Sequence, residues 1–80
     1  MKKIEYYFRY VVTGQIEKEF TTLRESKIFA KKNNEKIYLT VYLYSNKYNE
    51  PYDEILITGS TNIKESKSKL IQVVLKYAHA

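Results

Sequence analysis

Residues 37–45 show a strict alternation of side chains, and this alternation limits the fold more than any other feature of the 80-residue chain. Aliphatic residues occupy every odd position from 37 to 43, and tyrosine or threonine occupies every even position from 38 to 44. Successive side chains of a strand point to opposite faces of a sheet. The pattern therefore predicts a strand with an aliphatic face in the core and a tyrosine-rich face turned away from it.

The same period of two predicts an N-terminal hairpin. A strand over residues 4–13 alternates in this way, and Gly14 follows as a turn residue that tolerates positive φ. We expect a return strand over residues 16–21, with Ile16 and Phe20 facing inward. A lysine lies between these two on the same face, which is typical of a short strand near a sheet edge.

A fourth strand is predicted over residues 52–58, after a polar loop that ends at Pro51. Proline lacks the backbone donor that a strand ladder uses, so we expect no continuous strand through Pro51. The run from Ile55 to Ile57 is apolar at three consecutive positions. The pattern therefore leaves open which face of this strand is turned inward.

The first helix is marked at both ends. Thr22 followed three residues later by Glu25 resembles a capping box, in which each side chain satisfies a free backbone N–H group. Asn33 and Asn34 can supply the left-handed conformation that ends a helix. These signals predict a helix that runs to about Lys32.

A second helix is expected after Asn62, because Asn62 and Glu65 repeat the N-cap spacing of the first. From there towards the C-terminus the helix has a wide apolar arc, more than one sheet face requires. Two interpretations stay open. A thin core draws the whole arc inside, or a homodimer forms through Ile71, Val74 and Leu75.

Together these elements predict an α+β fold. It consists of a four-stranded antiparallel sheet with two helices on one face, in the order strand-strand-helix-strand-strand-helix, as a single domain over residues 1–80. Nine tyrosines belong to a hydrophobic total of 44%, so the core is thin unless some of them enter it. Tyr6, Tyr10 and Tyr77 fall on core-facing positions. No apolar run approaches 18 residues, so we expect no membrane partner.

The sequence offers little to an enzyme. The chain has no cysteine, which excludes a disulfide framework and a thiolate site and fits a cytoplasmic location. His79 is the only histidine, and two isolated glycines cannot form a glycine-rich phosphate loop. We therefore expect a non-enzymatic protein with no catalytic residue, no metal and no cofactor.

A binding surface is predicted on the outward side of two strands. The net charge of +5 favours an anionic partner, although a lysine-rich composition explains it equally well. If the first and third strands are neighbours, their outward tyrosines form a platform that can stack bases or anchor a protein interface. The alternative is that tyrosines simply fill the outer face of the sheet. The candidate residues are Tyr7, Arg9, Tyr38, Tyr42 and Tyr44.

A second candidate surface lies on the first helix. Arg24, Lys27 and Lys31 follow one another at helical spacing with Ile28 beside them, and we name these four residues the basic stripe. Such a stripe suits phosphates or carboxylates. An exposed isoleucine beside cations is typical of a protein interface. The alternative is an ordinary solvated helix face.

The hairpin followed by the capped helix over residues 22–32 resembles small phage-encoded inhibitors, the anti-CRISPR proteins with a hairpin–helix–sheet build. The resemblance covers residues 4–45 and rests on pattern and capping. It implies a viral protein that inhibits a host defence complex by occupying a protein surface in the host cytoplasm. Many such inhibitors are acidic mimics of nucleic acid, whereas this chain is basic, so we expect a host protein with an acidic patch as the partner. A nucleic-acid-binding domain and a homodimeric regulatory or structural subunit remain alternatives.

Overall fold

The computed structural model describes residues 5–44, 49–57 and 61–78. The α+β fold and the order of its elements are confirmed. His79, Gly59 and residues 46–48 of the predicted polar loop lie outside the described residues. Six elements follow one another along the chain: β1 (Glu5–Thr13), β2 (Lys18–Phe20), α1 (Leu23–Asn33), β3 (Lys36–Tyr44), β4 (Asn49–Ile57) and α2 (Ile63–Ala78).

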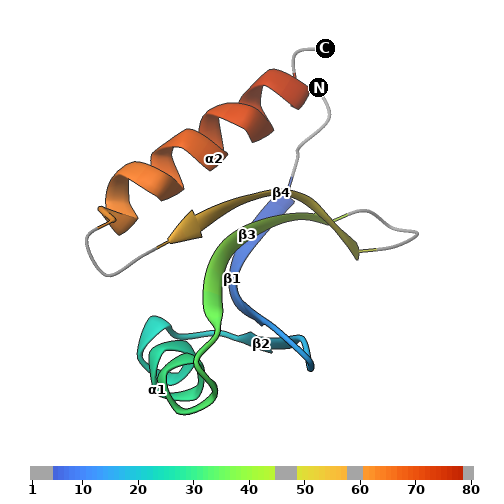
Figure 1. The fold of residues 1–80 in the computed structure, drawn as a ribbon. Helices are drawn as coiled ribbons and strands as arrows, with labels where there is room; N and C mark the ends of the chain where they lie inside the picture. The colour runs from blue at the N-terminus through green and yellow to red at the C-terminus, as the bar shows by residue number, and fades with distance from the viewer. Residues whose placement is uncertain (1–4, 45–48, 58–60, 79–80) are drawn as a thin grey trace.

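The strands form one antiparallel sheet in the order β2-β1-β3-β4. β1 and β3 lie side by side in the middle, with Tyr7 opposite Tyr42 and Val11 opposite Tyr38. β2 is an edge strand, as its inward lysine predicted. Figure 1 shows that the strands bend strongly, with α2 along β3 and β4 and α1 beside β2.

Both helices begin at the residues that the sequence marks. The Thr22 hydroxyl accepts a hydrogen bond from the backbone N–H of Glu25 at 3.4 Å, and Asn34 ends α1 in the left-handed conformation with φ of 51°. The Asn62 side chain accepts from the backbone N–H of Glu65 at 3.2 Å. Side chains that satisfy free N–H groups at a helix start are short-range features, which is why both starts could be predicted.

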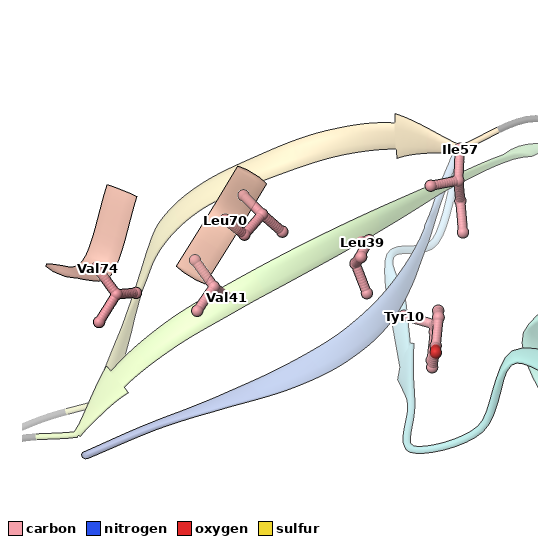
Figure 2. Packing of buried hydrophobic residues seen from close by; sticks show 6 residues of the cluster. All are labelled: Tyr10, Leu39, Val41, Ile57, Leu70 and Val74. Atoms are coloured by element: carbon pink, nitrogen blue, oxygen red, sulfur yellow. The ribbon is translucent and has the colours of Figure 1, made fainter. Parts of the chain in front are cut away.

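The core forms a row along the sheet. Figure 2 shows Leu70 and Val74 of α2 near Val41, with Leu39 further along β3 and Tyr10 at the far end of the row. Leu23 of α1 packs against the same cluster, so both helices cover one face. The molecule measures 45 × 27 × 17 Å, which corresponds to one sheet and one layer of helices. None of the described elements covers the opposite face.

Pro51 lies inside β4, so the predicted start of that strand is wrong. β4 begins at Asn49, and its pairing with β3 shifts at a bulge between Val41 and Tyr42, where Tyr42 lies opposite Pro51. An edge strand has one side without a ladder, and a bulge interrupts pairing locally. Both conditions allow a proline that lacks a backbone donor.

The ambiguous run in β4 is resolved by packing. Ile57 is buried in the core, and Ile55 is half-buried against it. Leu56 lies opposite Tyr38 on the other face of the sheet and is exposed. Since α2 packs along β4, the two isoleucines are the residues that the helix covers.

Three residues that were expected inside are exposed: Ile16, Tyr6 and Tyr77. β2 covers only Lys18–Phe20, so Ile16 precedes the strand and is not held against the core. Tyr77 packs on the ring of Tyr52 instead, with centroids 5.1 Å apart. Of the three tyrosines assigned to the core, Tyr10 alone is buried.

Gly14 has a different role from the one its turn position predicted. No described glycine has a positive φ. The carboxylate of Glu35 lies so close to Gly14 that a Cβ there would collide with it. The glycine therefore allows a close approach between the hairpin and the end of α1, and it does not supply a left-handed turn.

Candidate functional site

The five predicted residues of the tyrosine surface share one face of the sheet, as their positions on neighbouring β1 and β3 require. Their exposure differs strongly. Tyr42 is only 8% exposed, Tyr7, Arg9 and Tyr38 are half-buried, and Tyr44 is 50% exposed. The structure therefore brings the five together, but among them only Tyr44 offers a largely free ring.

Tyr42 is held by two contacts within the chain. Its ring stacks on the ring of Tyr7, with centroids 5.1 Å apart and planes at 5°. Its hydroxyl donates a hydrogen bond to Oε1 of Glu19 on β2. Burial, this hydrogen bond and the negative charge of Glu19 raise the pKa of Tyr42 well above its ordinary value, so the phenol stays protonated at a pH where a free tyrosine ionises. Tyr42 links strands and presents no free face for stacking.

Arg9, the one cation among the five residues, is also engaged. Its guanidinium carbon lies 4.5 Å from the centre of the Tyr7 ring. Its Nη1 donates a hydrogen bond to the backbone carbonyl of Phe8 at 2.8 Å. Stacking of a guanidinium on an aromatic face is favourable and restricts both side chains. Binding a phosphate or carboxylate with Arg9 would compete with these contacts.

Acidic groups border the tyrosine face. Glu17, which precedes β2, and the segment Pro51–Glu54 of β4 line a common hollow of about 420 Å³. β2 and β4 are opposite edges of the sheet, so carboxylates stand at both sides of this hollow. A nucleic-acid backbone would meet these carboxylates, which disfavours binding of its phosphates here.

The basic stripe, by contrast, is open to solvent. Arg24, Lys27, Ile28 and Lys31 are all exposed, and the Ile28 side chain is 62% exposed. The helix contacts to the sheet come from a different side of α1, where Ser26 and Ala30 are buried. The stripe is therefore an exposed cationic surface with one large aliphatic side chain within it.

A pocket of about 390 Å³ opens beside the basic stripe, and the sequence does not reveal it. Helical spacing places Lys27 and Lys31 on the side of α1 next to Leu23 and Ala30, and this part of the wall could be predicted. The remaining walls come from β3, β4 and the start of α2, which only tertiary packing brings together. The lining residues are Leu23, Lys27, Ala30, Lys31, Ile37, Ile57, Thr61 and Ile63.

The predicted dimer surface on α2 is corrected in one position. Val74 is buried in the core at 1% exposure, so it cannot contact a second copy. Ile71 is half-buried and Leu75 is exposed. The wide apolar arc is therefore divided between the core and the surface.

Within the described part of the chain, no group of three or more histidine, aspartate or glutamate side chains is arranged to hold a metal ion. Neither described helix is both long enough and apolar enough to cross a membrane. No protein-family model matches this chain, and neither does any curated protein or solved structure. The class that the fold and site define is thus a small α+β protein with an exposed basic helix face.

Proposed function

We propose that this chain is a non-enzymatic binding protein that docks through the basic stripe of α1 onto an acidic surface of a partner protein. One observation carries the proposal. All four residues of the basic stripe are exposed, whereas Tyr7, Arg9 and Tyr42 of the tyrosine face are engaged with one another. The surface that remains available is therefore the helix and not the sheet.

The composition of the stripe fits a protein partner. Burying an isoleucine side chain such as Ile28 contributes about 1.5–3 kcal/mol. The cations around it would meet carboxylates at the rim, where charges steer association and select the partner more than they add affinity. An aliphatic centre with a charged rim is the usual composition of a protein interface.

Inhibition of a host defence complex is the form of this function that the resemblance to phage-encoded inhibitors supports. A chain of this size with one docking face acts by covering a surface that its target needs. The target would be a protein of the host cytoplasm with an acidic patch. The basic charge of the chain supports this reading over mimicry of nucleic acid.

The test is affinity capture from a host lysate by the immobilised chain, with and without nuclease treatment. We expect one acidic-surfaced protein at near-stoichiometric level from nuclease-treated lysate. The variant Arg24→Gln/Lys27→Gln/Lys31→Gln should weaken its binding about tenfold, since each exposed charge pair contributes up to about 1 kcal/mol.

The matched control removes three exposed cations from α2 instead. Lys64→Gln/Lys69→Gln/Lys76→Gln has the same net charge and should capture the partner as the unmodified chain does. Equal loss in both variants would mean that net charge and not the stripe is responsible. Recovery that disappears with nuclease would favour the nucleic-acid alternative, and recovery of no protein would contradict the proposal.

A further inference from the structure

We propose that the pocket between α1 and the start of α2 is a binding site for a small amphipathic carboxylate, with a medium-chain fatty acid anion as the class of ligand. The apolar chain would lie against the aliphatic walls, and the carboxylate would lie at Lys27 and Lys31. This site goes beyond the proposed docking function, because it shares only Lys27 and Lys31 with the basic stripe and its apolar walls lie outside it.

The walls suit an apolar chain. Five aliphatic side chains contributed by four elements line the pocket: Leu23, Ala30, Ile37, Ile57 and Ile63. Ala30 and Ile57 are buried, and the other three are half-buried, so the walls are held by the core and not by solvent-exposed tips. A volume of about 390 Å³ falls at the lower end of the range for ligand sites, roughly 300–1,000 Å³. The pocket therefore fits a small ligand.

The charges select an anion. Lys27 and Lys31 are one helical turn apart, and neither forms an ion pair with any described residue. Two like charges at this spacing repel one another, and an anion placed between them removes that repulsion. Thr61 is the lining residue with a hydroxyl, and no arginine takes part. Because the polar groups are few and the walls are apolar, the site favours a carboxylate with an apolar body over a bare phosphate.

The first experiment is a methyl-detected NMR titration of the folded chain with sodium decanoate, kept below its micelle concentration. We expect saturable shifts of the methyl groups of Ile37, Ile57 and Ile63. Decanol, which has the same chain without the charge, should bind about three- to tenfold more weakly, because two exposed cations contribute modestly to affinity. Decyltrimethylammonium should bind more weakly than decanol.

Two matched variants assign the effect to the pocket. Lys27→Gln/Lys31→Gln should reduce decanoate affinity to that of decanol, whereas Lys69→Gln/Lys76→Gln on α2 removes the same charge and should leave it unchanged. Ala30→Leu places a larger side chain at the wall and should abolish binding of both ligands. If Ala30→Leu does not fold, Ile63→Ala tests the wall instead and should lower the affinities for decanoate and decanol by the same factor.

Several outcomes would overturn the proposal. Shifts that do not saturate, shifts confined to exposed apolar residues such as Leu75, or tighter binding of the ammonium than of decanoate would each exclude the site. Equal loss in the two lysine variants would exclude a role for the pocket lysines. None of these outcomes concerns capture of a protein partner through the basic stripe, which is measured in a separate experiment, so the two proposals fail separately.

Discussion

The two faces of the sheet are buried by different means. On one face, α1 and α2 cover aliphatic residues, and Leu39, Val41 and Leu70 have no exposed surface. On the other face none of the described elements lies over the strands, yet Val11 and Thr40 are only 2% exposed. There the side chains of the sheet itself, among them the stacked tyrosine rings, exclude the solvent.

The tyrosine face buries surface without a second layer of helices. A chain of 80 residues buries a smaller fraction of its surface than a larger protein does. Few aliphatic residues remain to form a hydrophobic layer on the second face of the sheet. Each tyrosine ring covers a large area and keeps its hydroxyl available for a hydrogen bond. Tyr7 and Tyr42 therefore form a shallow second core, and a tyrosine-rich face is not by itself a binding surface.

The largest effect is expected on the helix-covered face. Leu70→Ala removes a fully buried side chain, and we expect the free energy of unfolding to fall by about 2–5 kcal/mol. Leu75→Ala, five residues along the same helix, removes an exposed side chain and should change it by less than about 0.5 kcal/mol. Urea denaturation followed by circular dichroism measures both. Equal losses would show that α2 packs through a different side.

The sharpest comparison of the two faces uses a matched pair of valines. Val41 is buried beneath the helices and Val11 is buried on the uncovered face. We expect Val41→Ala and Val11→Ala each to lower the free energy of unfolding by about 1–3 kcal/mol, because each leaves a cavity among packed neighbours. A loss below about 0.5 kcal/mol for Val11→Ala alone would show that the tyrosine face is solvated.

Tyr42→Phe tests the link between β3 and β2. The variant keeps the ring stacked on Tyr7 and removes the hydrogen bond to Glu19, so we expect a loss of about 1 kcal/mol in the free energy of unfolding. Tyr44→Phe is the control, since Tyr44 is exposed and should change stability by less than about 0.5 kcal/mol. An equal change in the two variants would mean that the Glu19 contact adds nothing to stability.

Thr40→Val is expected to stabilise the protein. The Thr40 hydroxyl oxygen is buried on the uncovered face and has no hydrogen-bond partner among the described residues. A buried hydroxyl group without a hydrogen-bond partner destabilises the folded state, and a methyl group of similar shape does not. We therefore expect the free energy of unfolding, measured by thermal or urea denaturation, to rise by up to about 1 kcal/mol. A loss of stability would show that the hydroxyl has a partner, such as a bound water, in solution.

The smallest effect depends on pH. Because the folded state raises the pKa of Tyr42 above the value of about 10 in the unfolded chain, the unfolded chain loses its proton first as the pH rises. The contribution of Tyr42 is therefore fully present below about pH 10 and is lost progressively above it. Denaturation at about pH 8 and about pH 11 should show the advantage of the unmodified chain over Tyr42→Phe shrinking. A constant difference would contradict the raised pKa.

Much of the fold could be predicted because its signals are local. The alternation from Ile37 to Tyr44 assigned each side chain to one of two faces, and the structure keeps that assignment. The caps at Thr22 and Asn62 marked both helix starts to the residue. These features depend on neighbours within four residues, so the sequence itself contains them.

The errors arise where distant segments decide the outcome. Pro51 is tolerated because β4 is an edge strand with a bulge opposite Tyr42, and neither condition is visible near Pro51 in the sequence. Gly14 is constrained by Glu35, twenty-one residues further on. Tyr6 points to the predicted face but is exposed. The alternation of a strand predicts the face to which a side chain points, but not whether another element packs over that side chain.

The sequence by itself therefore determined the order of the elements, both helix starts and the direction of the side chains on β1 and β3, and it placed a basic stripe on α1. Only the tertiary structure decided which of the outward residues are free. Tyr42 is held by stacking on Tyr7 and by its hydrogen bond to Glu19. Ile37, Ile57 and Ile63 line one pocket together with residues of α1. The physical reason is that backbone periodicity sets where a side chain points, whereas burial depends on which distant segment packs over it.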